Sequence, residues 1–316
     1  ISDSPFTGIF HLAFATADPD VQIIEYSGGG TFKVDENFKI VNGGGADIEF
    51  KPEEKKIVVT INEKYTWNDG TPVTSADFLE YYKIVAHKDY TGIRFDDDIR
   101  NVVGIDEYHD GKAKNISGVV KKDDKTVVLK YKEIKPALLW GNGFVAEFLN
   151  KSQVEAASKD FTKFAEADLN KKPLSYGPYY LDKVVNGESV LAKANPYYYK
   201  KSEVKIPEIQ FKVVSPAQAS AVLKNGDVDL MDSLTTGIWD GTKDAKNGTI
   251  LGESDYYVSY VGFKLGKFNK EKGEVEVDPN AKAADKRVRQ AFGYAVDWDQ
   301  INEKIYKGLR FTPTGS

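Results

Sequence analysis

Few residues of this 316-residue sequence have the types and spacing that catalysis or metal binding needs. The histidines His11, His87 and His109 are not spaced as metal ligands, and we interpret each as a surface or packing residue. The absence of cysteine excludes disulfides, zinc–thiolate sites and cysteine nucleophiles. The sequence also lacks a Gly-x-Ser-x-Gly elbow, a P-loop, a Gly-x-Gly-x-x-Gly loop and a His-Glu-x-x-His motif. The residues alone therefore point to no known catalytic motif, and we expect no cofactor.

Acidic residues cluster in two places where a cation or a sugar could bind. The run Asp-Asp-Asp at residues 96–98 could contact a hard cation, but adjacent carboxylates point in different directions, which favours a solvated turn. The second cluster is Asp227, Asp229 and Asp232. Residues two apart on a strand share a face, so Asp227 and Asp229 would lie side by side on one. A carbohydrate-active enzyme would need two carboxylates opposed across a groove. A carbohydrate-active enzyme therefore stays an alternative function, of a different class from a binding protein.

Aromatic residues are abundant, with 18 tyrosines, 17 phenylalanines and 4 tryptophans. The densest groups lie at residues 176–180, 197–199 and 256–260. A tyrosine combines a large flat contact surface with one polar group, which suits the recognition of varied ligands. Alternating tyrosines also fill the core of a sheet. For any single tyrosine this structural role is favoured unless the residue lies in a cleft.

These residues belong to a chain with the composition of a globular, weakly acidic protein. Hydrophobic residues make up 41% and charged residues 29%, and the net charge of −5 offers no broad attraction to nucleic acid or anionic lipid. No run of about 18 apolar residues occurs, so no membrane span is predicted. The length favours two domains over one, because single cores stop growing at roughly 250–300 residues.

Hydrophobic patterns predict strands and helices without strict βαβ alternation, which indicates the α/β class in its mixed α+β form. The clearest strand covers 57–61, and the clearest helix follows a turn at 68–72 and begins at Thr74 or Ser75. Hairpins are predicted at 119–132 and at 179–194 around Asn186-Gly187. Further expected elements are a strand at 31–34, a helical stretch over 136–170 with a capping box at 152–155, a strand at 208–214, a helix over 216–225, a strand at 256–263, and helices capped by Asp285 and Asp297.

Residues 65–78, Tyr-Thr-Trp-Asn-Asp-Gly-Thr-Pro-Val-Thr-Ser-Ala-Asp-Phe, resemble the motif of a known protein family. That family is the family 5 extracellular solute-binding proteins, the oligopeptide-binding components of ABC importers. Three further stretches agree in the family's order: Gly-Pro-Tyr at 177–179 with Asn-Pro-x-Tyr at 195–198, Asn-Gly-Asp-Val-Asp at 225–229, and Asp-x-Arg-Val-Arg-Gln-Ala at 285–291 through Ala-Val-Asp at 295–297. We expect the first motif to be structural: Trp67 packs, residues 68–70 turn, and Thr74 caps a helix. Tyr176 departs from the family's usual glycine.

The resemblance covers essentially the whole chain and implies a periplasmic-binding-protein-like fold of type II. Residues 1–30 and 173–263 would form a discontinuous domain I, residues 31–172 an inserted domain II, and residues 264–316 the beginning of a truncated domain III. The family's first strand is expected before Ile1, and most of its third domain after Ser316. Because Met231 is the sole methionine, we expect Ile1 to be a processed or truncated start.

The same resemblance implies a non-catalytic receptor that captures oligopeptides and delivers them to the permease subunits of an ABC transporter. Family members hold peptides largely by main-chain pairing, with roomy hydrated pockets for side chains. We expect the pairing strand of domain I near residues 7–10 and a cleft aromatic of domain II at Tyr90. The predicted peptide-binding residues are Gly8, Ile9, Phe10, Tyr90, Asp232, Trp239, Tyr256 and Phe263.

Localisation and alternative ligands also follow from the resemblance. We expect a cell-surface lipoprotein of a Gram-positive bacterium, or a periplasmic protein in a Gram-negative one, with a lipid anchor outside this segment as its only membrane association. The alternatives within the family are another solute, namely an oligosaccharide, nickel or haem, and the sensing of a peptide pheromone. The lack of clustered histidines speaks against a metal, whereas the aromatic residues leave sugars open.

Overall fold

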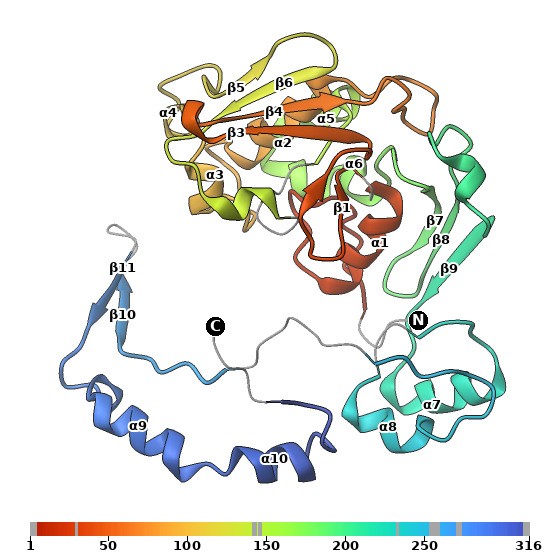
Figure 1. The fold of residues 1–316 in the computed structure, drawn as a ribbon, viewed down its shortest axis with the longest axis vertical. Helices are drawn as coiled ribbons and strands as arrows, with labels where there is room; N and C mark the ends of the chain where they lie inside the picture. Colours follow the sequence, from red (N-terminus) through yellow and green to blue (C-terminus); the bar gives the residue numbers. More distant parts are fainter. Residues whose placement is uncertain are drawn as a thin grey trace. The chain divides into compact units, whose positions relative to one another are not determined.

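The computed structural model describes residues 5–28, 31–140, 144, 147–231, 234–252, 260–269 and 274–311 (Figure 1). The chain divides into two compact units, Ile1–Ser215 and Pro216–Ser316. Among the described residues, no helix is both long and apolar enough to cross a membrane. The division into domains I, II and III stays a prediction.

An antiparallel sheet supports the larger core of the first unit. Its strands lie in the order β3 (Ala46–Lys51), β4 (Lys56–Ile61), β6 (Thr126–Lys130) and β5 (Val119–Lys121). Alternate residues of the central strands are buried, including Ile57 and Val59 of β4 and Leu129 of β6, all at 0% exposure. One face of the sheet is therefore packed, as the period-2 pattern of 57–61 predicts. The predicted hairpin at 119–132 is confirmed as β5 and β6.

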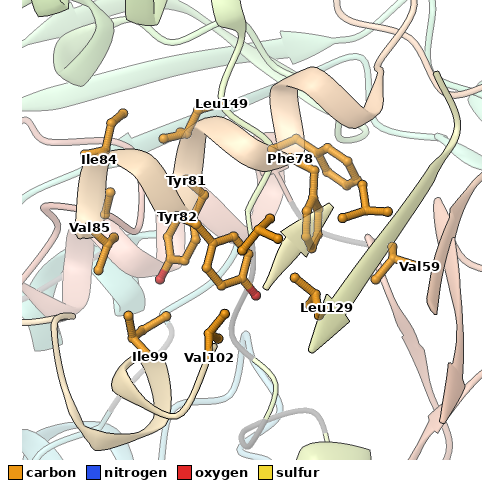
Figure 2. Close-up of a cluster of buried hydrophobic side chains, with 14 of the residues drawn as sticks. Val59, Phe78, Tyr81, Tyr82, Ile84, Val85, Ile99, Val102, Leu129 and Leu149 are labelled. Carbon is orange, nitrogen blue, oxygen red and sulfur yellow. The ribbon is translucent and has the colours of Figure 1, made fainter. Parts of the chain in front are cut away.

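Helix α2 (Ser75–Val85) packs against this sheet and begins where its sequence predicts. Gly70, at a φ of +86°, allows the preceding turn. Thr74 donates from its backbone N–H and its hydroxyl to the Asp77 carboxylate, at 2.8 and 2.9 Å. Figure 2 shows Phe78, Tyr81 and Tyr82 of α2 beside side chains of β4 and β6 in the core. The helical period thus places the apolar face of α2 on the sheet.

A buried cluster of aromatic rings surrounds Trp67, which is 1% exposed. The Tyr176 ring lies 5.2 Å from the Trp67 ring, 5.4 Å from Tyr65 and 5.6 Å from Phe148, in edge-on arrangements. The predicted packing role of Trp67 is confirmed. Tyr176 is 4% exposed and fills a core position that a glycine would leave empty.

The remaining elements of the first unit's larger core are short. They are β1 (Lys33–Val34), β2 (Ile40–Val41), α3 (Asp97–Arg100), α4 (Ile105–His109), α5 (Lys151–Ala157) and α6 (Asp168–Lys171), with 3₁₀ turns at Pro52–Glu54, Pro136–Leu139 and Ser158–Glu166. The predicted capping box at 152–155 is wrong, because Asn150 caps α5 and accepts from the Gln153 N–H at 3.2 Å. Asp77 sets this start, since its carboxylate accepts from the Lys151 N–H at 2.9 Å.

A second core in the first unit joins the two ends of its sequence. Helix α1 (Asp18–Gly28) packs on a sheet of three antiparallel strands. The strands are β7 (Tyr179–Val185), β8 (Ser189–Ala194) and β9 (Glu208–Lys212), and a 3₁₀ turn at Lys201–Glu203 lies between β8 and β9. Phe6, Ile23 and Leu181 are among its buried residues. The Gly177 N–H donates to the Ser27 carbonyl at 2.7 Å, and a Cβ at Gly177 would lie 2.6 Å from that oxygen. This close approach requires the glycine of the Gly-Pro-Tyr stretch.

The second unit contains four helices and one hairpin within its described residues. They are α7 (Pro216–Asn225), α8 (Thr236–Thr242), β10 (Gly266–Asn269), β11 (Glu274–Val277), α9 (Lys286–Ala295) and α10 (Trp298–Lys304), with a 3₁₀ turn at Lys282–Ala284. The predicted caps Asp285 and Asp297 are confirmed, accepting from Arg287 N at 2.8 Å and from Gln300 N at 2.9 Å. Of the predicted strand at 256–263, residues 256–259 lie outside the described residues and residues 260–263 form no strand.

Candidate functional site

Residues 7–15, here called the N-terminal loop, contain three of the predicted peptide-binding residues. The Asp20 carboxylate, 0% exposed, accepts hydrogen bonds from the N–H groups of Thr7 at 2.8 Å, Gly8 at 2.8 Å and Ile9 at 3.1 Å. The Thr7 hydroxyl donates to it at 3.1 Å. The Phe10 N–H donates to the Asn170 carbonyl at 2.6 Å. Four consecutive main-chain donors are therefore already used inside the protein.

The predicted pairing strand at residues 7–10 is wrong as a strand. These residues form a loop, and Gly8 has a φ of +84°, which lies outside the extended region. With their N–H groups bound to Asp20 and Asn170, only carbonyl groups remain for a ligand. Phe10 is 1% exposed, so its side chain contributes to the core.

Tyr90 and Arg94 bind the N-terminal loop from the segment that follows α2. The Tyr90 hydroxyl donates to the Ala13 carbonyl, and its ring lies 4.9 Å from the Phe14 ring. The Arg94 guanidinium donates from Nε to the Leu12 carbonyl at 3.3 Å and from Nη2 to the Ala15 carbonyl at 3.4 Å. The structure therefore brings Tyr90 to the loop that holds Gly8, Ile9 and Phe10. Its contact with a peptide stays a prediction.

Glu147 and His11 form a buried titratable pair beside the same loop. Glu147 accepts from the Leu12 N–H at 2.9 Å and lies 4.0 Å from Nδ1 of His11. Burial raises the pKa of Glu147 to about 8 and outweighs the amides of Leu12 and Ala13, which lower it. Burial likewise lowers the pKa of His11 to about 4, although the Asn170 side chain beside the ring favours its charged form. Both side chains are neutral at pH 7, so the contact is not an ion pair.

This pair predicts a fall in stability between pH 6.5 and 8. The folded chain keeps the Glu147 proton up to about pH 8, whereas the unfolded chain releases it near 4.5. Unfolding then releases a proton, and rising pH lowers the free energy of unfolding. His11 acts in the opposite direction between its folded pKa of about 4 and its unfolded value of 6.5. The two effects oppose each other below pH 6.5, and above it Glu147 alone lowers stability by about 1–2 kcal/mol.

Urea denaturation at closely spaced pH values measures this fall, and Glu147→Gln should abolish it. Glutamine keeps an acceptor for the Leu12 N–H but does not titrate in this range. The matched control is Glu155→Gln, whose carboxylate is exposed and should leave the pH profile unchanged. If the free energy of unfolding changed with pH equally in the unaltered chain and in Glu147→Gln from pH 6.5 to 8, Glu147 would not be the group responsible. No sequence motif marks Glu147, because only the fold shows that it is buried.

The predicted site residues of the second unit are only partly described. Trp239 lies in α8 and is half-buried. Phe263 is also half-buried, with its ring 5.5 Å from the Phe292 ring at 88°. Asp232 and Tyr256 lie outside the described residues. Trp239 and Phe263 thus keep accessible aromatic surface, as a ligand contact requires.

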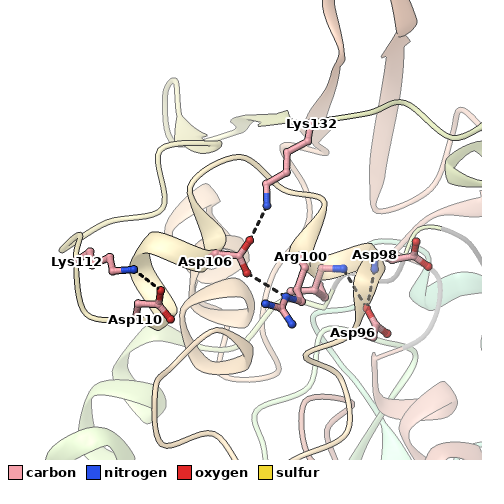
Figure 3. A network of polar contacts seen from close by, with 8 residues as sticks. Asp96, Asp98, Arg100, Asp106, Asp110, Lys112 and Lys132 are labelled. Carbon is pink, nitrogen blue, oxygen red and sulfur yellow. Dashed lines mark hydrogen bonds and ion pairs between the residues drawn. The ribbon is translucent and has the colours of Figure 1, made fainter. Parts of the chain in front are cut away.

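The acidic run at 96–98 begins a helix. Asp96 caps α3 by accepting from the N–H groups of Asp98 at 3.1 Å and Ile99 at 3.0 Å, and Asp98 pairs with Lys135 at 2.8 Å. Figure 3 shows the neighbouring ion pairs, in which Asp106 contacts both Arg100 and Lys132. Among the described residues, no three His, Asp or Glu side chains are grouped to hold a metal ion.

Of the acidic residues Asp227, Asp229 and Asp232, the structure describes only the first two. Asp227 and Asp229 are exposed, and Asp232 lies outside the described residues. Two carboxylates facing each other across a groove, which a glycosidase needs, are not formed by Asp227 and Asp229.

Comparison with known sequences identifies the family. The family model for bacterial extracellular solute-binding proteins, family 5 Middle, matches residues 46–315. The oligopeptide-binding protein OppA of Lactococcus lactis subsp. lactis is 32% identical over 324 residues, which cover 100% of this chain and 53% of that protein. The periplasmic murein peptide-binding protein MppA of Escherichia coli (strain K12) is 26% identical over 303 residues, covering 93% of this chain and 51% of MppA. The chain thus spans about half the length of these curated relatives.

Solved structures agree with the sequence comparison. Lactococcal OppA complexed with an endogenous peptide in the closed conformation matches with a TM-score of 0.88 and 30% identity, over 96% of this chain and 57% of that chain. Escherichia coli MppA matches with a TM-score of 0.69 at 22% identity, over 96% of this chain and 56% of MppA, which shows the fold. The predicted mixed α/β, type II periplasmic-binding-protein-like fold is confirmed. The family is one of solute-binding proteins rather than of enzymes, and this chain belongs to the bacterial extracellular solute-binding proteins of family 5.

Proposed function

We propose that this chain works in a receptor that captures oligopeptides outside the cytoplasmic membrane and delivers them to the permease subunits of an ABC transporter. The observation that carries the proposal is the TM-score of 0.88 with lactococcal OppA holding an endogenous peptide. The 32% identity to an oligopeptide-binding protein, which extends over the whole chain, supports the same ligand class. In this role the chain catalyses no reaction.

The proposal includes three domains and an extracellular or periplasmic location. A lipid anchor on the cell surface would hold the receptor near its permease in a Gram-positive bacterium, while periplasmic confinement would do so in a Gram-negative one. Domain I would comprise residues 1–30 and 173–263, domain II residues 31–172, and domain III would begin at residue 264. The core shared by residues 6–24 and 179–192 supports a first domain interrupted by an insertion.

Four partly exposed side chains are the best-supported candidates for peptide contact. Ile9 belongs to the N-terminal loop of the first unit and Tyr90 contacts that loop at Ala13, whereas Trp239 and Phe263 belong to the second unit. Gly8 is buried and its N–H is bound to Asp20, so we assign it and Phe10 to positioning the loop. Main-chain carbonyls and half-buried aromatic rings suit a ligand that varies in sequence.

Titration calorimetry with a mixed oligopeptide library tests this function, using the longest form of the protein that its natural reading frame encodes. We expect heat of binding with peptides and none with nickel, haem or an oligosaccharide. Trp239→Ala and Phe263→Ala should each weaken peptide binding about tenfold, as loss of an aromatic contact does. Trp140→Ala, at an exposed site in the first unit, is the matched control. Binding of another solute without any peptide binding would refute the proposal.

A further inference from the structure

A cavity of about 220 Å³ is hollowed into the first unit beside helix α2. An engineered apolar cavity of about 150 Å³ accommodates benzene. The volume here therefore suits one ring with a short polar chain. The lining residues used below are Tyr81, Tyr82, Arg94, Asp96, Ile99 and Tyr131.

The wall of this cavity is largely apolar and aromatic. Figure 2 shows the Tyr81 and Tyr82 rings extending from α2 with their hydroxyl groups toward Ile99 and Val102. Ile99 is 7% exposed and Val102 is 1% exposed. The Tyr82 and Tyr131 side chains are hydrogen-bonded to each other, so their rings present apolar surface with the polar ends already paired. An aromatic or branched side chain would pack well on this wall.

One polar group in the wall is left without a partner. Tyr81 is 0% exposed, and its hydroxyl has no hydrogen-bond partner among the described residues. Buried hydroxyl groups in proteins are nearly always hydrogen-bonded, because burial removes them from water. Glu147 and Arg94 are electrostatic neighbours of the Tyr81 hydroxyl, and of the two only Arg94 is charged at pH 7. The hydroxyl is thus available to a ligand close to Arg94.

The cavity is lined by charged side chains of both signs, Arg94 and the carboxylates Asp96 and Asp98. Both hydrogen bonds that Asp96 accepts as the cap of α3 go to its Oδ1 atom. The neighbouring Asp98 is already paired with Lys135. Arg94 donates one bond from Nε and one from Nη2 to the N-terminal loop, and a guanidinium carries five N–H donors in all. One carboxylate and one guanidinium therefore remain able to contact a small ligand.

We propose that this cavity binds a free α-amino acid with an aromatic or branched apolar side chain. The side chain lies against Tyr82, Tyr131 and Ile99. The ammonium group faces the Asp96 carboxylate, and the ligand carboxylate accepts hydrogen bonds from Arg94 and Tyr81. Charge-assisted contacts at both ends select a zwitterion over a simple hydrocarbon. The site goes beyond peptide capture and does not depend on it, because all its residues belong to the first unit.

Titration calorimetry of the 316-residue chain with L-phenylalanine tests the site. Two truncated ligands separate the charge contacts: 2-phenylethylamine lacks the carboxylate, and 3-phenylpropanoate lacks the amine. We expect L-phenylalanine to bind and each truncated ligand to bind at least about tenfold more weakly. Absence of binding up to roughly 10 mM L-phenylalanine, or equal affinity for all three ligands, would overturn the proposal.

Variants that preserve the fold localise the binding to this cavity. Tyr81→Phe keeps the ring and removes the unpaired hydroxyl, and Asp96→Asn keeps a good cap for α3 while removing its charge. Each should weaken L-phenylalanine binding about tenfold. Ile99→Phe should fill the cavity and abolish binding. Tyr108→Phe, at a half-buried tyrosine outside the cavity, is the matched control and should bind normally.

Two further readouts make the variant results decisive. Unchanged thermal unfolding midpoints show that a loss of binding is local rather than a loss of fold. Oligopeptide affinity should be the same in Tyr81→Phe as in the unaltered chain, so the amino-acid site and peptide capture can fail separately. Unaltered L-phenylalanine affinity in both Tyr81→Phe and Asp96→Asn would place any binding elsewhere and overturn the proposal.

Discussion

Replacement of Asp20 by alanine is expected to lower the free energy of unfolding by about 4 kcal/mol. The carboxylate is 0% exposed and accepts from three consecutive N–H groups and one hydroxyl of the N-terminal loop. Alanine supplies no acceptor, and each buried donor left unpaired costs about 1–3 kcal/mol. The Thr7 and Ile9 bonds are only partly buried, so water can replace them in part. The Gly8 N–H is buried and has the least access to water.

Urea denaturation of Asp20→Ala measures the loss, with Asp35→Ala as the matched control. The Asp35 carboxylate also accepts two main-chain bonds, from Asn37 N at 2.9 Å and Lys39 N at 3.0 Å, but both are exposed. Water replaces those bonds, so the control should lose less than about 1 kcal/mol. The loss of unfolding free energy in Asp20→Asn should be intermediate, because the amide keeps one acceptor oxygen and turns a donor toward the loop. Equal losses in Asp20→Ala and Asp35→Ala would contradict the role of Asp20.

The elements that sequence predicted well are those specified by neighbouring residues. The turn before Thr74 and the hairpin around Asn186-Gly187 depend on contacts within a few residues. The strand at 57–61 is marked by its own alternating pattern, although its partner strands lie at 46–51 and 126–130. Alternating burial, a cap with its acidic partner, and a residue pair that tolerates positive φ are all visible in the local pattern. The motif at residues 65–78 belongs to this class, because its turn and its cap are local.

The features that sequence did not predict depend on residues far apart in the chain. The family resemblance predicted a strand at residues 7–10, but Asp20 binds the N–H groups of Thr7, Gly8 and Ile9 from 11 to 13 positions away. The predicted cap at Ser152 fitted its local pattern, yet Asp77 fixes the chain 74 positions away and moves the helix start to Asn150. The bond from the Tyr90 hydroxyl to the Ala13 carbonyl spans 77 positions and was likewise not predicted. Tertiary hydrogen bonds of this kind override local preference and leave no periodic signal.

Replacement of Trp67 by alanine is the second change with a large expected effect, again about 4 kcal/mol of unfolding free energy. Trp67 is 1% exposed and packs edge-on against Tyr176. Truncation removes a large apolar side chain and leaves a cavity, because the surrounding rings belong to separate segments of the chain and relax only partly. The backbone at Trp67 also closes the turn, with its N–H donating to the Thr71 carbonyl at 2.8 Å. That bond survives the substitution, so the loss should come from packing.

Two further tryptophan variants separate packing from ligand binding. Trp67→Phe retains a ring and should lose about half as much stability, while Trp140→Ala, 43% exposed, should lose less than about 1 kcal/mol. Urea denaturation gives the stability, and calorimetry on the folded fraction gives the oligopeptide affinity. A structural role for Trp67 predicts full affinity in Trp67→Phe despite its lower stability. Reduced peptide affinity in Trp67→Phe at unchanged stability would instead assign Trp67, and with it the motif at residues 65–78, to ligand recognition.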